Sequence, residues 1–213
     1  MNIRLKGLWW AITLGWCLLG TARGAESDGV KPSSVVHLAD LRYELAALQT
    51  NISASLVSLH RVQEAATAGS PLGQAVGDFC GQFILTQDRV EAVRRKAVVV
   101  KARVKSHYDA WGLELTKMQN PQIRAQAGSR ITGSKEQFAR IIASADEAKK
   151  EALPFVSDLK DVMINLEADP SEDAVKLLAE TIAELDRRSL SVVGRLREVD
   201  EQIERTIQTL PQK

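Results

Sequence analysis

Residues 38–66 read LADLRYELAALQTNISASLVSLHRVQEAA and place an apolar side chain at alternating steps of three and four residues. Such spacing is a heptad seam, because residues three and four apart line up on one face of an α-helix. The members of this first seam are Leu38, Leu41, Leu45, Leu48, Ile52, Ser55, Leu59, Val62 and Ala66. The stretch therefore predicts a long amphipathic helix that buries one face.

Three further seams of the same kind follow along the chain. The second includes His107, Trp111, Leu115 and Met118 near its end, and Pro- or Gly-containing breaks separate it from its neighbours. Because the connections are short, neighbouring helices should pack antiparallel. The sequence predicts an all-α fold, an elongated antiparallel four-helix bundle or coiled coil with heptad seams. The predicted helices span residues 35–68, 72–119, 122–168 and 171–210, which form a single helical domain, 35–210.

Two details modify this prediction. Gly73, Gly77 and Gly81 weaken the start of the second helix, and small residues at this spacing favour close contact between helices. Pro154 falls inside the third helix, where it removes one backbone hydrogen bond and should cause a kink.

The start of the chain has the three parts of a secretory signal peptide. Arg4 and Lys6 form a basic start, residues 7–20 (GLWWAITLGWCLLG) are mostly apolar, and TARGAES follows. An apolar run of 14 residues is short for a helix that spans a hydrocarbon core of about 30 Å. We therefore expect cleavage after Gly24 or Ala22 and export, with the periplasm as the expected location and an inner-membrane signal anchor as the alternative.

Removal of the predicted signal peptide (residues 1–24) changes the charge balance. It leaves 25 basic and 27 acidic residues, a formal net charge of −2, ahead of a polar, flexible lead-in at residues 25–34. A nearly neutral chain argues against a general nucleic-acid binder.

The two cysteines predict neither a lipid anchor nor an intrachain disulfide. Cys17 lies inside the apolar run and follows Trp16, whereas lipid-modified cysteines follow a small residue. Export would leave Cys80 as the single cysteine, so it has no partner within the chain. Its setting, GDFCGQF, predicts a thiol buried at a close helix contact, with an intermolecular disulfide as the alternative.

The residues that bind metals or haem in helical bundles are missing from the sequence. No glutamate stands three residues before His37, His60 or His107, and there is no C-x-x-C-H or H-E-x-x-H motif. We therefore expect no metal, no cofactor and no enzymatic activity. His107 occupies a seam position four residues before Trp111. It is interpreted either as a half-buried polar residue that fixes helix register or as a buried ligand or pH-sensitive contact.

Basic residues crowd the second predicted helix, whereas the segment from Asp161 to Asp186 is rich in acidic residues. One hypothesis is that the basic helix binds anionic lipid headgroups or another anionic envelope polymer. The other is that basic and acidic faces pair between neighbouring helices and set their order. The basic residues in question are Arg94, Arg95, Lys96, Lys101, Arg103 and Lys105.

The middle of the chain, over roughly residues 85–207, resembles an exported bacterial family. The stretches HYDAWGLELTKMQNPQIRAQAGSR (107–130) and EQFARIIASADEAKKEALPFVSDLKDVMINL (136–166) carry the resemblance. The family is the domain of unknown function 2959, whose members resemble helical envelope proteins. Because that family has no established active site, the resemblance implies no functional residues. The residues that carry it are Trp111, Glu114, Pro154, Asp161, Asn165 and Leu166.

Two features depart from this family. Many members have a lipid-attachment cysteine after the apolar run, which this chain lacks, and a Lys-His-Asn-Leu-Asn type of segment is reduced here to Ile164–Glu167. The sequence thus predicts a non-enzymatic scaffold or protein-interaction module of the cell envelope, with an unknown envelope protein or a second copy as partner. The alternative is a peripheral membrane or envelope-polymer binder that uses the basic helix.

Overall fold

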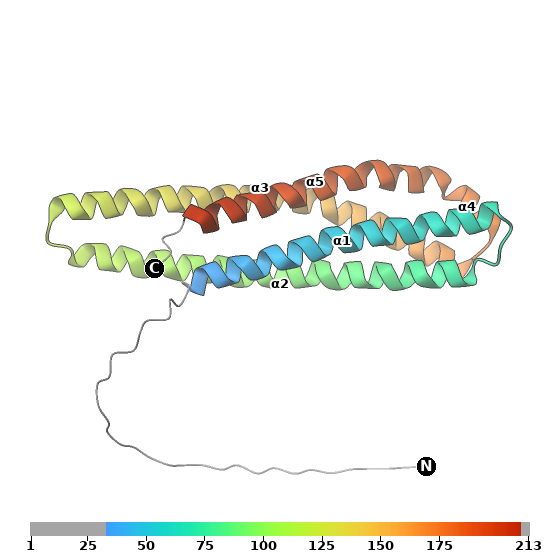
Figure 1. Cartoon of the computed structure of the whole chain (residues 1–213), viewed down its shortest axis with the longest axis horizontal. Helices are drawn as coiled ribbons and strands as arrows, with labels where there is room; N and C mark the ends of the chain where they lie inside the picture. The colour runs from blue at the N-terminus through green and yellow to red at the C-terminus, as the bar shows by residue number, and fades with distance from the viewer. Residues whose placement is uncertain (1–32, 210–213) are drawn as a thin grey trace, which may run out of the picture. The chain divides into compact units, whose positions relative to one another are not determined.

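The computed structural model describes residues 33–209, with side chains from His37 onward, and nearly all of these residues are helical. No strand occurs in this part of the chain, which confirms the all-α prediction. The predicted signal peptide, Cys17 and residues 25–32 of the predicted lead-in lie outside the described residues. The helices are α1 (Ser33–Thr67), α2 (Gly73–Lys117), α3 (Pro121–Ala168), α4 (Glu172–Leu177) and α5 (Ala179–Thr209), as Figure 1 shows.

Turn chemistry ends the long helices close to the predicted positions. At the end of α1, Gly69 has a φ of 64°, a backbone conformation that glycine adopts without a steric penalty. The amide of Ser70 donates to the carbonyl of Ala65 (2.9 Å), which is the Schellman pattern of helix ends. At the start of α3, the side chain of Asn120 accepts from the amides of Gln122 and Ile123. Pro121 follows as the first helical residue, where its missing amide hydrogen costs little.

The predicted fourth helix is divided into α4 and α5. Leu178 interrupts it with φ −85° and ψ −4°, and its amide donates to the carbonyl of Ala174 (3.1 Å). The amide of Ile182 donates back to the carbonyl of Leu178 (2.9 Å), so the chain keeps its course through this one-residue turn. The prediction of one continuous helix was wrong at this residue, because the heptad spacing does not register a local change of hydrogen bonding.

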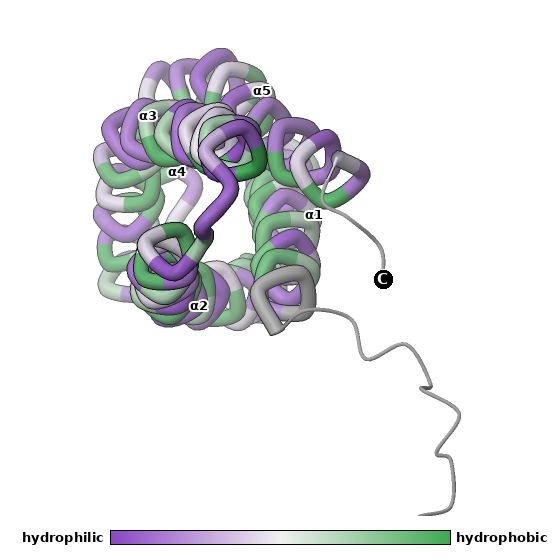
Figure 2. The backbone as a smooth tube through the Cα atoms, turned by 90° about the vertical axis from the view of Figure 1, so that its left-hand side faces the viewer, coloured by the Kyte–Doolittle hydropathy of each residue, from purple (hydrophilic) through white to green (hydrophobic). Residues whose placement is uncertain are grey.

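The four long helices are arranged as a bundle in which each contacts two neighbours. α1 packs along α2 and α5, and α3 packs along the same two helices. Figure 2 looks along the helix axes and shows them as separate columns around a shared interior. The predicted seams form that interior: all nine members of the first seam are buried, and the body of α5 buries its seam from Ile182 to Ile203. The largest fully buried side chains include Phe79, Phe83, Phe155, Ile52, Leu59, Leu159, Leu166, Ile182, Leu185 and Ile203.

Polar contacts between helices add specificity to the apolar core. The hydroxyls of Ser55 and Thr86 form a buried hydrogen bond (2.8 Å), so the polar slot of the first seam has a partner on α2. At the α1–α5 contact, Arg42 binds the carboxylates of Asp200 (2.8 Å) and Glu204 (3.2 Å). These pairs fix the register in which the seams meet.

The arrangement tests the expectation about the three glycines, whereas the kink at Pro154 stays a prediction. The prediction of close helix contact at Gly73, Gly77 and Gly81 was wrong, since the three glycines are exposed and a Cβ atom at each would meet nothing within 4 Å. Small-residue spacing is ambiguous because it records which side chains are short, not which face is covered. Pro154 lies on an exposed side of α3, and the helix continues on both sides of it.

Candidate functional site

Among the described residues, α1 and α5 end before α2 and α3 do along the long axis of the bundle. Part of α2 and α3 is therefore covered by neither α1 nor α5. The last residue of α5, Thr209, donates to the side chain of Gln137 on α3 (3.5 Å). Lys96 on α2 pairs with Asp40 (2.9 Å), which places the first residue of α1 level with about residue 103 of antiparallel α2. Among residues 33–209, only α2, the turn and α3 continue beyond these levels, as Figure 1 shows.

We call this two-helix extension, residues 105–136, the hairpin arm, and the four-helix part the body. At 1.5 Å per residue, the arm segment of each helix is about 20 Å long. The hydroxyl groups of Tyr108 and Ser134 form a hydrogen bond (2.8 Å) that holds the two arm helices together. The ammonium group of Lys135 lies 5.6 Å from the centroid of the Tyr108 ring, which adds a cation–π contact.

The arm continues the heptad seams of the body and covers them only in part. On the arm, Ile131 of α3 is 5% exposed, whereas Trp111, Leu115 and Met118 are half-buried. In the body, Val100 and Val104 of α2 are 3% and 7% exposed, and Val90, Val93 and Ala97 on the same helix are half-buried. Two helices cover each other along one line, and the remaining sides of both seams face outward. Single exposed apolar side chains occur both near the tip, where Leu113 and Ile123 are 64% and 54% exposed, and in the body, where Leu177 and Leu190 are 85% and 78% exposed.

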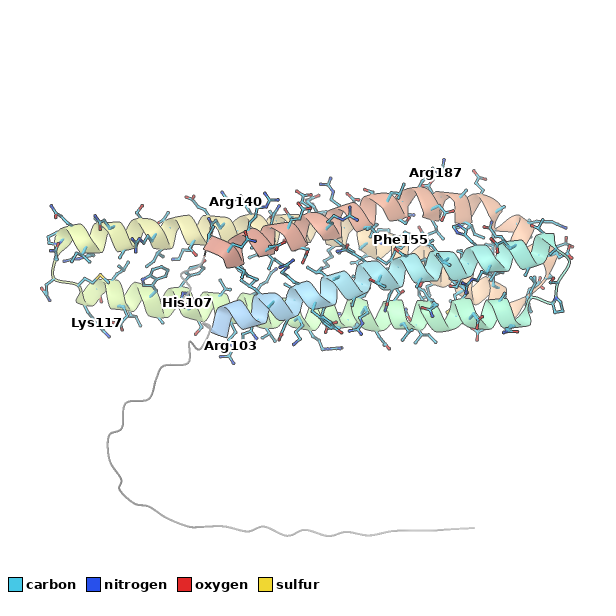
Figure 3. The ribbon with its side chains drawn as sticks, viewed as in Figure 1. Arg103, His107, Lys117, Arg140, Phe155 and Arg187 are labelled. Carbon is cyan, nitrogen blue, oxygen red and sulfur yellow. The ribbon has the colours of Figure 1, made fainter. Side chains whose placement is uncertain are left out.

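His107 marks the point where the body ends. Its ring centroid lies 5.8 Å from that of Tyr108 and 5.7 Å from that of Trp111. The side chain is exposed, so both interpretations that placed it in a covered seam were wrong. The seam register was right, but α1, which covers this side of α2 further along, begins level with about Arg103. Figure 3 labels Arg103, His107 and Lys117 along this part of α2.

The six predicted basic residues lie on α2 without sharing one face. A helix turns about 100° per residue, so Arg94, Lys101 and Lys105 form one stripe, and Lys96 and Arg103 form another on the side of α1. Arg95 points away from both, and Lys96 is the one member that is half-buried. The residues therefore surround the helix.

Ion pairs use part of this charge. Lys96 pairs with Asp40 on α1, and Lys105 with Asp109 on its own helix (2.7 Å), a contact that raises the pKa of the Lys105 ammonium group. Arg94 lies 3.6 Å from Glu91. The partner of the basic helix is thus α1, and the hypothesis that paired it with the acid-rich segment was wrong in its choice of helix. Within residues 33–209, no ion pair involves Arg95, Lys101 or Arg103.

Neither the cysteine nor the histidines form a site of obvious chemistry. Cys80 is half-buried and packs against the core, so the prediction of a buried thiol was too strong. Burial raises the pKa of the Cys80 thiol, and the carboxylate of Glu167 adds to the effect, so the thiolate is disfavoured at neutral pH. His60 contacts the carboxylate of Asp186 (2.8 Å) between α1 and α5. In the part of the chain that the structure describes, no three histidine, cysteine or acidic side chains converge as around a metal ion.

The concavities of the described bundle are shallow surface grooves. One of about 440 Å³ lies between α3 and α5 near the level where the arm begins, and its lining includes Arg140, Arg205 and Gln202. The amide nitrogen of Gln202 donates to the hydroxyl of Ser144 (2.8 Å), and its buried Oε1 has no partner among the described residues. None of the described helices combines the length and the apolar character that crossing a bilayer requires.

The heptad seams do not predict the arm, although the sequence contains a signal for it. The predicted first helix (35–68) is shorter than the predicted second helix (72–119), and this difference alone requires an uncovered end. The arm is the feature of the described residues that is built unlike the rest, because it repeats the core pattern without the helices that would cover it.

Comparisons with known proteins support the family and no further assignment. Neither curated proteins nor solved structures yield a match to the chain. The family described as Protein of unknown function (DUF2959) matches residues 35–210, which span all the described helices except the first two residues of α1. The chain therefore belongs to the DUF2959 family.

Proposed function

We propose that this chain is a non-enzymatic, exported interaction module of the cell envelope, in which the body is a scaffold that presents the hairpin arm to a partner. The single observation that supports the proposal is the change in burial along one continuous seam. Val104 is 7% exposed, whereas the next seam position, His107, is exposed and Trp111 is half-buried. Large apolar side chains left open at one end of a stable bundle are typical of a protein-binding surface.

The arm is also suited to binding because the body can support it. Ion pairs and the buried Ser55–Thr86 hydrogen bond fix the helices of the body, whereas the arm depends on its two helices and the Tyr108–Ser134 contact. A rigid base with a narrow extension presents residues beyond the surface of the body. An envelope location is supported by the predicted signal peptide, which lies outside the described residues.

Site-specific photo-crosslinking in the source cell tests this function. A photoreactive amino acid at Ala110 on the arm should yield discrete crosslinked products, whereas the same residue at exposed Thr181 on α5 should yield none. Equal or absent crosslinking at the two positions would contradict the proposal. Fractionation of the same cells tests export, because intact protein that starts at Met1 would exclude cleavage of the signal peptide.

A second candidate function follows from the basic residues of α2 that form no ion pair among residues 33–209. Arg95, Lys101 and Arg103 are exposed and belong to no ion pair among residues 33–209. Exposed cations attract anionic lipid headgroups or an anionic polymer even when, as here, they point to different sides of one helix, and the attraction falls with salt. Binding to anionic vesicles that is lost on neutralising these three residues, and kept on neutralising Arg187 and Arg205 on α5, would favour this function over the first.

A further inference from the structure

We infer that the partner of the hairpin arm is the hairpin arm of a second copy, so that two arms pack antiparallel about a two-fold axis and complete a four-helix bundle between the copies. The inference rests on the proposed function and specifies its partner. Four features of the arm support it: the apolar seams of its two helices, the sequence next to α1 and α5, the height of its residues along the helix axis, and its charged side chains.

The seam defines the shape of the missing cover. In the body, α2 is covered by α1 and α3 by α5, and both covering helices run antiparallel to the helix they cover. The arm needs the same cover, namely two linked antiparallel helices that carry an apolar seam. A second arm meets this requirement, because a two-fold rotation perpendicular to the helices places α2 against α2 and α3 against α3, both antiparallel.

The composition of the sequence next to the described helices favours a second copy over the chain itself as this cover. The residues before α1 read AESDGVKP (25–32), and Val30 is the one large apolar side chain among them. Pro32 disfavours helical backbone at the residue before it, and Pro211 disfavours continuation of α5. The stretch before α1 does not have the heptad spacing of the seams that cover the body.

The height of the seam residues along the arm indicates where the two-fold axis would lie. Tyr108 and Ser134 are hydrogen-bonded, so Trp111 and Ile131, each three residues nearer the tip, also lie level with each other. Trp111 is the midpoint of the arm segment of α2, residues 105–117. An axis at this level brings the two copies of Trp111 together at the centre of the interface, where aromatic anchors contribute most to binding.

The charges of the arm permit this approach. With the axis at Trp111, Lys105 of one copy lies level with Lys117 of the other. Lys105 pairs with Asp109 (2.7 Å) and Lys117 with Glu114 (2.7 Å), so each lysine is already paired with a carboxylate of its own helix. With the axis at Ile131, Lys135 of one copy comes level with Ala127 of the other, and no like charges on α3 stand opposite each other at that position.

The size of the surface sets the expected affinity. The arm has 32 residues (105–136), and if about half of them reach the partner, the interface buries on the order of 1,000 Å² in total. This is the range of weak or transient complexes. We expect self-association in the micromolar range, and not a permanent dimer.

Sedimentation equilibrium of the purified chain from Ala25 onward, over a concentration series, tests the inference. The wild-type chain should self-associate, and Trp111→Lys should weaken association at least tenfold. Leu113→Lys is the matched control, because Leu113 lies two residues away on the outer side of the same helix and is already 64% exposed. A wild-type chain that stays monomeric, or equal weakening by both substitutions, would overturn the inference.

A second measurement keeps the test decisive if Trp111→Lys unfolds the arm. In a Cys80→Ser background, Ala110→Cys places a thiol close to the two-fold axis, and mild oxidation should link two chains, whereas Leu113→Cys should not. Failure to link at Ala110 together with a monomeric wild type refutes the second copy as partner. If photo-crosslinking at Ala110 still captures a different protein in cells, the proposed interaction function stands and only its partner was wrong.

Discussion

The body and the arm carry the same apolar pattern and differ in what covers it. In the body, four seams meet, and the described core includes side chains with no exposed surface, such as Phe83 and Phe155. Figure 3 labels Phe155. In the arm, two seams meet, and Trp111 stays half-buried. A heptad pattern therefore identifies the face of a helix that will be buried if a partner is present. The presence of that partner depends on the lengths of the other helices.

The largest expected effect tests whether the two regions differ in what they contribute to stability. Phe83→Ala should lower the free energy of unfolding by about 3–5 kcal/mol, because it leaves a cavity in the body. Trp111→Ala should lower it by less than about 1 kcal/mol, because a half-buried side chain at an uncovered site leaves no closed cavity. Urea denaturation at a concentration where the chain is monomeric measures both. Similar losses for the two variants would mean that the arm is part of the same cooperative core.

The second prediction compares the inter-helix hydroxyl pair of each region. Ser55→Ala in the body should cost about 1 kcal/mol, because it removes a buried hydrogen bond, while the Thr86 hydroxyl keeps its bond to the carbonyl of Gln82 (3.2 Å). Tyr108→Phe in the arm should cost less than about 0.5 kcal/mol, because water can replace the partner of the half-exposed Ser134 hydroxyl. Chemical denaturation of the single variants measures the costs.

A control for this comparison is the double variant Ser55→Ala with Thr86→Val. Because both polar groups are then gone and the shape is nearly kept, the double variant should lose less than the sum of the single losses. Strict additivity would show that the hydrogen bond does not couple α1 to α2.

Residues such as Ile52 and Val62 could be predicted as core from the sequence, because heptad spacing is local and every member of the first seam has a covering helix. His107 obeys the same spacing and is exposed, because its burial depends on where α1 begins. The partner of Lys96 likewise could not be predicted from the sequence. Charge pairing depends on the register of α1 against α2, and turn geometry and packing determine that register. The candidate site is thus the part of the molecule where the heptad spacing predicts burial but no neighbouring helix among the described residues covers the seam.

The third prediction uses glycines that no neighbour contacts in either region. Gly77→Ala in the body and Gly112→Ala in the arm add a Cβ that meets nothing within 4 Å, so each should gain helix propensity of up to about 1 kcal/mol. The gain at Gly77 should raise the midpoint of global unfolding. The gain at Gly112 should appear as slower amide hydrogen exchange within the arm, because the arm opens without unfolding the body. If Gly112→Ala instead raised the global midpoint as much as Gly77→Ala, the two regions would unfold as one.

The smallest expected effect concerns charge pairs. Several pairs in the body join different helices, whereas those in the arm join neighbouring turns of one helix. Glu151 on α3 accepts hydrogen bonds from Ser191 and from Arg195 (3.0 Å) on α5, and these lower the pKa of its carboxyl group from 4.5. A carboxyl group with a lowered folded-state pKa stabilises the fold fully above its unfolded value, and the contribution disappears as pH falls through the folded value. Because the pair is partly exposed, we expect less than about 1 kcal/mol. Glu151→Gln should therefore reduce stability at pH 7 but not at pH 2, whereas Asp109→Asn in the arm should leave global stability unchanged at both; a pH-independent loss for Glu151→Gln would assign its role to packing and not to charge.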